Sequence, residues 1–355
     1  MSEKYKEVIK AFIVSRIVIF SVAYVLFYLF MHHYFSLPFA PPNYVENGQG
    51  TLNWRPLNVL YYYDAVHYID IAENGYDKWW LTCWFPLYPL LIRAFGSTVA
   101  SAVIVSNLSL LIALFAIYQL GGKKALWLAA FSPISIVFSS VYSESLFLAL
   151  TAWGMVAAER KKPVLCGILI GLAALTRPLG WTTIIGVGVF LALKQGLKAA
   201  TNVILLGSII GLLYPVYLFL QFGDPLLFIN ANTIIFGREI CLPFSLLLTD
   251  IKHLFCGHDL KSIIILLNFT GFLLLFKGIT TKWWPYTLVY ALIVLCSGIT
   301  NQKAWIGYSP YVFGLLRYTG ACAPVYLTNH QESILPWIIF SIIIDILITF
   351  KLFIF

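Results

Sequence analysis

Long apolar runs separated by short polar stretches make up most of the chain. A membrane helix needs about 20 apolar residues in a row, and the runs are continuous rather than alternating, which predicts helices and not strands. We therefore predict an all-α, polytopic helical membrane protein with about 11 transmembrane helices, built as one integral-membrane domain over residues 1–355. The predicted helices cover residues 11–31, 98–119, 125–140, 144–159, 163–180, 181–194, 200–221, 260–276, 284–299, 312–328 and 334–353.

The segment 32–97 interrupts this pattern, and we predict that it forms a long first outer loop. It opens with the helix breakers PFAPPN and NGQG. Within it, residues 56–72 interleave polar groups such as Asp64 with apolar ones, which predicts an amphipathic interfacial helix. Residues 79–95 are apolar but contain two prolines, so we expect an interfacial or partly inserted helix there and not a full span.

Lysine and arginine residues gather in short stretches between the apolar runs. With the N-terminus in the cytoplasm and residues 79–95 left out of the spans, these basic clusters all fall on the cytoplasmic side, as the positive-inside rule requires. Counting residues 79–95 as a span would put them outside. The basic clusters are Lys123–Lys124, Arg160–Lys162, Lys194–Lys198 and Lys277–Lys282.

The composition excludes a soluble globular protein, since 60% of residues are hydrophobic, 11% are charged and the mean hydropathy is +0.86. A net charge of +8 would suggest nucleic acid in a soluble protein. Here the positive-inside placement explains it, so we expect membrane lipids and no nucleic acid as partners. No nucleotide-binding motif is present, and His253, Cys256 and His258 lack a second ligand pair, so no metal site is predicted.

The same topology sends a second set of charged residues toward the outer face. An ionisable group at membrane depth costs about 2.5–3.5 kcal/mol on insertion scales, so several such groups aimed at one face need a reason. We predict that they line a shared polar cavity that opens outward. Its candidate members are Asp64, Glu144, Arg177, Asp224 and Arg317.

The stretch from about Tyr61 to Tyr326 carries, in this order, DAVHYIDIAENGY, WFPLYPLLIR, SNLSLL, FSPISIVFSSVYSESLF, LAALTRPLG, FGDPLLF and LLRY before APVY. In this combination and spacing the motifs resemble the GPI mannosyltransferase II (phosphatidylinositol-glycan class V) family. That family belongs to the GT-C superfamily of multi-spanning glycosyltransferases, which use lipid-phosphate sugars. The resemblance implies a GT-C-like fold.

The resemblance also implies an activity: transfer of a hexose, typically mannose, from a dolichyl or other polyprenyl phosphate to an acceptor hydroxyl on the luminal or outer face. In GT-C enzymes an acidic residue of the first outer loop acts as base, and Asp64 matches that position. The family has Trp where this chain has Tyr63. The acceptor would be a glycolipid or another glycan, and no cofactor is implied beyond the donor substrate.

The family also works with a second membrane protein, which implies a small partner subunit. The implied location is the endoplasmic reticulum membrane in a eukaryote or the cell membrane in a prokaryote.

Such a transfer needs a carboxylate that takes the proton of the acceptor, and positive charge beside the departing phosphate. One carboxylate suffices for a single displacement with inversion. Arg317, Arg177 and Arg93 are the candidate phosphate ligands, because the guanidinium group matches phosphate oxygens with two parallel donors. The structural alternative is that each arginine reaches to the interface or pairs with Glu144 or Asp224.

The other candidate substrate contacts each have a structural alternative as well. His67 follows Asp64 by one helical turn and would orient its carboxylate or bind the acceptor, or it is an ordinary interfacial histidine. Glu144 starts a helix between two serines and belongs to the cavity or acts as a capping carboxylate. Asp224 lies in a GDP turn signal.

A transporter or lipid flippase is the alternative from another functional class, because polar groups inside a helix bundle are expected there too. Key charges on one side and the lack of an internal repeat favour the transferase. A third interpretation is a catalytically silent scaffold that needs its partner subunit.

Overall fold

The computed structural model of the protein describes residues 3–31, 56–61, 64–256, 260–300, 315–327 and 334–349. The expectations that concern Tyr63, His258 and residues 32–55 fall outside this part of the chain. The α-helices are α1 (Glu3–Met31), α2 (Ala65–Asn74), α3 (Leu87–Ala94), α4 (Val99–Ala130), α5 (Glu144–Glu159), α6 (Pro163–Ala174), α7 (Gly180–Gln195), α8 (Leu197–Gly211), α9 (Leu213–Phe222), α10 (Leu227–Phe236), α11 (Ser245–Cys256), α12 (Leu260–Ile279), α13 (Trp284–Cys296), α14 (Leu315–Gly320) and α15 (Ile334–Thr349). Shorter elements are the 3-10 helices η2 (Pro56–Leu60), η3 (Trp79–Cys83), η4 (Val137–Ser139) and η5 (Ala323–Tyr326), and the strands β1 (Arg238–Ile240) and β2 (Ser297–Ile299).

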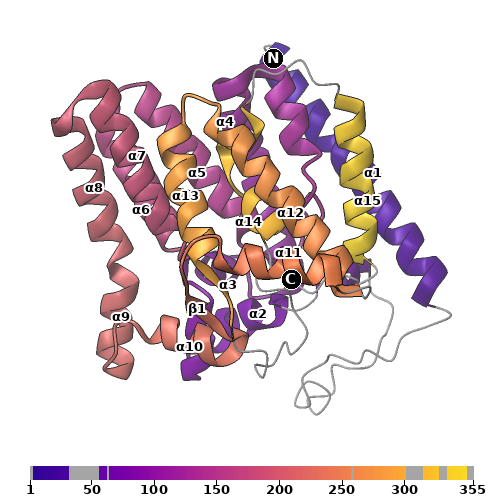
Figure 1. Ribbon diagram of the computed structural model, residues 1–355, viewed down its shortest axis with the longest axis horizontal. Coiled ribbons are helices and arrows are strands. Elements are labelled where there is room, and N and C mark those ends of the chain that lie inside the picture. Colours follow the sequence, from indigo (N-terminus) through magenta and orange to yellow (C-terminus); the bar gives the residue numbers. More distant parts are fainter. Residues whose placement is uncertain are drawn as a thin grey trace.

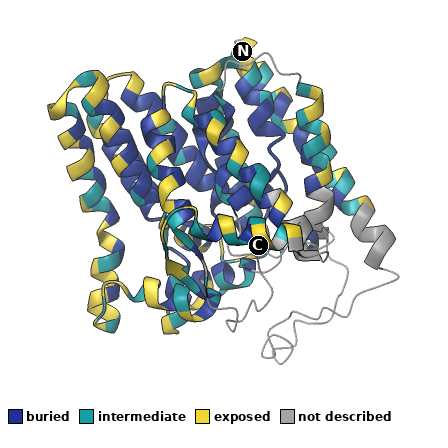
Figure 2. Cartoon of the chain, viewed as in Figure 1, coloured by how far each residue is buried: buried dark blue, intermediate teal, exposed yellow. Residues whose placement is uncertain are grey.

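The longer helices lie side by side in a bundle, with α8 at one edge and α1 and α15 at the other (Figure 1). The short helices α2, α3 and α10 gather at one end of this bundle (Figure 1). Buried residues fill the middle of the bundle, and exposed ones mark its outer faces (Figure 2). The bundle therefore holds the core, and the short helices close one end.

Three helical stretches in the described residues are long and apolar enough to cross a membrane: 3–25, 99–130 and 197–222. Several shorter apolar helices accompany them. Large apolar side chains face outward on α8 and α9, where Leu197, Ile209 and Leu220 are 76%, 62% and 77% exposed. A soluble protein rarely exposes such a surface, whereas lipid covers it in a membrane. The protein is therefore a predominantly helical membrane protein, and the number of complete spans stays a prediction.

The predicted helix over residues 125–140 is wrong beyond residue 130. Helix α4 bends at Gly122, whose φ of 72° is left-handed, and ends at Ala130. The segment 131–143 that follows is irregular except for η4, and it is buried throughout. Proline lacks a backbone N–H, and serine hydroxyls compete for backbone carbonyls, so a segment that starts with FSPIS does not continue a helix. Ser140 Oγ, for example, donates to the carbonyl oxygen of Ile136 at 2.8 Å.

The predicted amphipathic helix over residues 56–72 is divided in two. Its first part is η2, and its second is α2, which begins after Asp64. Asp64 thus precedes the helix as its N-cap residue and does not lie within it. The next segment, 79–95, is also divided, into η3 and α3, with Pro86 directly before α3. This division agrees with the expectation that residues 79–95 do not form one full span.

Two more helix boundaries and one strand pairing differ from the prediction. The helix expected over 163–180 ends at Ala174, and a turn leads into α7. The helix expected over 312–328 consists, in its described part, of α14 and η5. The prediction of an all-α fold misses a small antiparallel sheet, in which β1 pairs with β2 and Glu239 lies opposite Gly298. That sheet joins two chain segments that the sequence pattern assigns to a loop and to a helix end.

One end of the bundle collects the basic clusters. Ion pairs and a hydrogen bond link α1, α4, α5 and the start of α13 there, and the side chain of Gln195 donates to the carbonyl oxygen of Ala158 at 2.6 Å. The clusters Lys123–Lys124, Arg160–Lys162, Lys194–Lys198 and Lys277–Lys282 therefore share an end, as predicted. The linking pairs are Glu7 with Lys123, Glu159 with Lys282, and Arg160 with Gln119.

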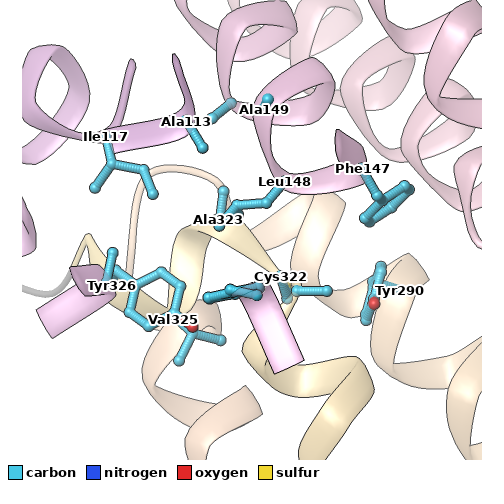
Figure 3. Packing of buried hydrophobic residues seen from close by; sticks show 14 of the residues in the cluster. Ala113, Ile117, Phe147, Leu148, Ala149, Tyr290, Cys322, Ala323, Val325 and Tyr326 are labelled. Atoms are coloured by element: carbon cyan, nitrogen blue, oxygen red, sulfur yellow. The ribbon is translucent and has the colours of Figure 1, made fainter. Parts of the chain in front are cut away.

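The buried core fixes α5 against η5. Phe147 and Leu148 from α5 belong to the same core cluster as Cys322, Ala323 and Tyr326 (Figure 3). Helix α5 begins at Glu144, and η5 follows closely after Arg317 in α14. This packing therefore sets the spatial relation between those two charged residues, which are distant in sequence.

Candidate functional site

Four charged side chains from four separate elements meet in one cluster at the end of the bundle opposite the basic clusters. Arg317 is central: its Nη1 donates to Oδ2 of Asp64 at 3.1 Å, and its Nε donates to Oε1 of Glu144. Arg177 forms an ion pair with the same Oε1. The cluster thus joins the segment between α1 and α4 to the starts of α5, α7 and α14.

Asp64 is the N-cap residue of α2, a position at which Asp usually accepts a hydrogen bond from the following turn. Here its side chain makes no such capping bond. Its backbone carbonyl does begin the helix and accepts from the N–H groups of His67 and Tyr68 at 3.1 and 3.2 Å. The carboxylate is therefore left for Arg317.

Two hydrogen bonds fix the loop that carries Asp64 to the start of α5. The N–H of Val141 donates to the carbonyl oxygen of Leu60 at 3.1 Å. The hydroxyls of Tyr68 and Ser143 lie 3.0 Å apart. Leu60 and Tyr68 lie on either side of Asp64, and Val141 and Ser143 lie within the three residues before Glu144. These bonds therefore set the separation of the two carboxylates.

Arg177 lies in the turn between α6 and α7. The carbonyl oxygen of Arg177 accepts from the N–H of Gly180 at 2.9 Å, which closes the turn. A Cβ on Gly180 would collide with the backbone of Ala174, so only glycine permits this close approach. The N–H of Leu87 also donates to the carbonyl oxygen of Leu175 at 3.0 Å and ties the turn to α3.

Arg317 is held by α12 and by an aromatic ring. A Cβ on Gly271 would lie 2.7 Å from the Cα of Leu316, so α14 lies directly against the α12 backbone. Thr319 Oγ1 donates to the carbonyl oxygen of Gly271 at 3.1 Å. The Cζ of Arg317 lies 4.5 Å from the ring centroid of the buried Tyr142, a favourable cation–π distance.

The two carboxylates are in different surroundings. The Asp64 side chain is 14% exposed and contacts one guanidinium group, whereas the Glu144 side chain is 1% exposed and contacts two. Among the described residues, Oε2 of Glu144 has no hydrogen-bond partner. Glu144 is thus placed to compensate both arginines, while Asp64 is the more exposed of the two carboxylates.

His67 does not join the cluster. Its ring lies against Trp84, with the centroids 4.1 Å apart, and edge-on to Trp80 at 5.3 Å. Burial lowers the pKa of His67 to about 4, against the opposing effect of Asp64 and Asp70. Within the described residues no hydrogen bond joins its ring to Asp64, so the aromatic packing favours a structural role.

Asp224 and Arg93 also lie apart from the cluster. Asp224 accepts from the N–H of Leu226 at 2.9 Å and from the side chain of Asn230 at 3.2 Å, so it orders its own turn. Arg93 is exposed and lines a separate, mainly apolar cavity of about 390 Å³, together with Tyr214 and Tyr217. In the described part of the chain neither residue contacts the cluster. The structure thus does not bring either residue together with the cluster, and their predicted contact with substrate stays a prediction.

Sequence reasoning missed Arg16, which is 5% exposed in the middle of α1. Its Nη1 donates to the carbonyl oxygen of Ser135 at 2.8 Å and to Oγ of Ser139 at 2.5 Å. Its Nη2 donates to the carbonyl oxygen of Ala130 at 3.0 Å. Arg16 thus supports the irregular segment that leads to Glu144. The available signal was an arginine inside an apolar run, which at membrane depth needs polar partners.

Across the described ranges, no three His, Cys, Asp or Glu side chains are grouped to hold a metal ion. The four clustered groups suit a different chemistry. A carboxylate that can take a proton stands beside guanidinium groups that can hold an anion.

Comparison with known proteins gives two similar relatives. The chain is 28% identical over 203 residues to the rat (Rattus norvegicus) protein GPI alpha-1,6-mannosyltransferase 2, and the match covers 50% of this chain and 41% of that protein. For the mouse (Mus musculus) protein of the same name, the identity is 29% over 199 residues, covering 49% and 40%. The matched region therefore spans about two fifths of the length of these relatives. The chain is similar to mannosyltransferases, which supports a glycosyltransferase of this kind.

No protein-family model matches the chain, and no solved structure matches it.

Proposed function

We propose that this protein is a membrane glycosyltransferase that moves a hexose, with mannose as the first candidate, from a dolichyl or other polyprenyl phosphate to a hydroxyl of a glycolipid or another acceptor. The similarity to mannosyltransferases supports the class of reaction. The observation that carries the proposal is the cluster at the end of the bundle, in which the partly exposed carboxylate of Asp64 lies beside the guanidinium group of Arg317.

The proposed step is a single displacement at the anomeric carbon. The acceptor hydroxyl oxygen forms a bond to C1 of the sugar on the face opposite the phosphate, and its proton passes to the Asp64 carboxylate. The bond between C1 and the phosphate oxygen breaks, and the polyprenyl phosphate leaves with the electron pair. The configuration at C1 is inverted once. The proton ends on Asp64, and the negative charge ends on the departing phosphate.

The other members of the cluster have distinct parts in this proposal. Arg317 orients the Asp64 carboxylate and lies close enough to share its charge with a phosphate oxygen. Arg177 adds a second guanidinium group. Glu144 compensates both arginines in the interior, because two buried cations without a carboxylate would be costly to desolvate.

We place the site on the outer or luminal face of the membrane. Helix α5 runs from Glu144 in the cluster to Glu159 at the end that holds the basic clusters, roughly 24 Å for 16 residues. Basic clusters mark the cytoplasmic side, which supports an outward-facing site in the endoplasmic reticulum of a eukaryote or in the cell membrane of a prokaryote. A small membrane partner subunit belongs to the same proposal.

The test is sugar transfer from radiolabelled dolichyl- or polyprenyl-phosphate mannose into a membrane lipid extract by purified protein. Wild-type protein is expected to label a new product. Asp64→Asn keeps the size of the side chain but loses the base, and we expect transfer to fall by about 10²–10⁴-fold. Lys282→Gln, at the other end of the bundle, is the matched control and is expected to retain activity.

Two outcomes would contradict the proposal. Near wild-type transfer by folded Asp64→Asn would remove Asp64 as the base. Absence of transfer from mannose and glucose donors by the folded wild type, also after co-expression with candidate membrane subunits, would favour a transporter. Counterflow of labelled lipid or sugar in proteoliposomes would then test that alternative directly.

A further inference from the structure

Two arginines lie against one ring at the edge of the cluster. The Cζ of Arg177 lies 5.5 Å from the ring centroid of Tyr318, and the Cζ of Arg238 lies 5.3 Å from the same centroid. Both distances are within the range of cation–π contact. Tyr318 directly follows Arg317, so Arg238 is the third arginine gathered at this place, although it comes from β1, outside the four elements of the cluster.

We propose that Arg238 binds the phosphate of the lipid-linked sugar donor, with Tyr318 positioning its guanidinium group. This inference rests on the function proposed above and adds a residue to it. Arg177 and Arg317 both face Oε1 of Glu144, and their side chains are only 10% and 6% exposed. Arg238 is half-buried. A phosphate that approaches Arg238 leaves both contacts to Glu144 in place.

The small sheet explains how Arg238 is held. Arg238 pairs with Ile299, and the N–H of Thr300 donates to the carbonyl oxygen of Gly237 at 3.0 Å. The hydroxyl of Thr233 donates to the carbonyl oxygen of Arg238 at 2.8 Å. A two-stranded sheet is only marginally stable alone, so its presence in a helical protein needs a reason. We infer that the sheet fixes the backbone of a ligand-binding arginine, because a preorganised group loses less conformational freedom on binding.

The chemistry of the leaving group explains why another cation is useful. The donor is a phosphate diester with one negative charge. When the bond between C1 and oxygen breaks, the departing monoester gains charge and approaches about −1.5 to −2 at neutral pH. A guanidinium group at the phosphate therefore binds the product more strongly than the donor and stabilises the charge that develops during the step.

The experiment measures binding and transfer separately, with purified protein in lipid nanodiscs. Binding of polyprenyl phosphate, the product without sugar, is compared for wild type, Arg238→Gln and Arg238→Lys, with unphosphorylated polyprenol as the ligand control. A lost charge-assisted contact is expected to weaken phosphate binding by about 10–100-fold in Arg238→Gln. The affinity of Arg238→Lys for polyprenyl phosphate should lie between those of wild type and Arg238→Gln, because lysine keeps the charge but cannot donate two parallel hydrogen bonds.

Matched variants separate this role from a structural one. Arg160→Gln changes an arginine at the opposite end and should leave binding unchanged. Asp64→Asn should lower transfer by about 10²–10⁴-fold while it still binds polyprenyl phosphate. Because β1 pairs through its backbone, we expect Arg238→Gln to keep the wild-type melting temperature, and size exclusion and thermal unfolding check this.

The outcomes distinguish this inference from the function on which it rests. Binding of polyprenyl phosphate that depends on Arg238, without any sugar transfer by the wild type even when candidate membrane subunits are co-expressed, would support the phosphate site and refute the transferase. Normal transfer and unchanged phosphate binding by Arg238→Gln would refute the role of Arg238 and leave the transferase standing. Failure of the wild type to bind polyprenyl phosphate would overturn the inference.

Discussion

The two ends of the helix bundle both carry ion pairs, but in different surroundings. At the basic end, Lys123 lies 3.0 Å from Glu7, and its side chain is 67% exposed. At the other end, Arg317 lies 3.1 Å from Asp64, and its side chain is 6% exposed. Nearly equal distances therefore describe two different interactions, because water screens the first pair and not the second.

The comparison distinguishes charged residues that set the orientation of the protein in the membrane from charged residues suited to a chemical role. Exposed ion pairs contribute about 0–1 kcal/mol, so the basic end gains little stability from its pairs, and its lysines are explained by membrane orientation. Buried ions cost several kcal/mol each to desolvate, and apolar replacements are often as stable. The cluster around Glu144 is therefore poorly explained by stability, and a chemical role accounts for it better.

Breaking the buried cluster is expected to have the largest effect on stability. Glu144→Gln keeps the shape of the side chain but leaves Arg177 and Arg317 without their shared carboxylate. We expect a loss of about 3–5 kcal/mol in unfolding free energy, seen as a lower melting temperature in detergent, together with loss of transfer. Glu144→Asp keeps the charge and should lose less. An unchanged melting temperature for Glu144→Gln would show that the arginines are compensated by other groups.

The pH dependence of stability tests the surroundings of His67. Burial lowers its pKa from the ordinary value of 6.5 to about 4 in the folded protein, so between these values the unfolded chain binds a proton that the folded protein does not. Stability should therefore fall as the pH drops from about 6.5 to about 4, by roughly 3 kcal/mol in total. Thermal unfolding at each pH measures this. The difference in stability between wild type and His67→Gln at each pH isolates the contribution of His67 from that of the carboxylates. Equal pH profiles for the two proteins would contradict the lowered pKa of His67.

Weakening the hydrogen bonds of Arg16 is expected to reduce the unfolding free energy by a smaller amount. Arg16→Lys keeps the charge but cannot reach Ala130, Ser135 and Ser139 together, since an ammonium group lacks the guanidinium fork. We expect about 2 kcal/mol of destabilisation, in the range for hydrogen bonds to charged groups. If the segment positions Glu144, the rate of transfer should fall more than the affinity for the donor. Wild-type kinetics in Arg16→Lys would limit Arg16 to a role in folding.

Removing a charge at the basic end should have the smallest effect. Lys282 lies 2.7 Å from Glu159, and its side chain is 53% exposed. Lys282→Gln should change the unfolding free energy by less than about 1 kcal/mol and leave transfer intact, with the small change declining further as salt is added. A loss of unfolding free energy as large as that of Glu144→Gln would show that the ion pairs at the two ends contribute equally to stability.

Local features of the sequence predicted much of the arrangement. The basic clusters, the helical class and the break at residues 79–95 follow from runs of neighbouring residues. The irregular segment 131–143 was not predicted, because its apolar content resembles that of a helix. Its backbone is satisfied by side chains distant in the sequence, such as Arg16, which lies 119 residues before Ser135.

The residues of the candidate site also include some that the sequence identified and some that only the structure identified. Asp64 was selected mainly because it matches the acidic residue of the family that the sequence resembles. Glu144, Arg177 and Arg317 were selected because each is a charged residue in or beside an apolar stretch. The sequence selected Arg93 and Asp224 on the same ground, and nothing local distinguished them. Arg238 gave no signal, because it lies in a segment without periodic pattern, and its contact with Tyr318 depends on strand pairing between residues about 60 positions apart.

By itself the sequence determined that the protein is helical, that it belongs in a membrane and which of its ends is basic, because hydrophobicity and charge act through the solvent at each position. Only the tertiary structure decided which charges meet. Arg317 reaches Asp64 across 253 residues and Glu144 across 173. Such contacts depend on helix packing and on close approaches such as that of Gly271 to Leu316, which a linear pattern does not encode.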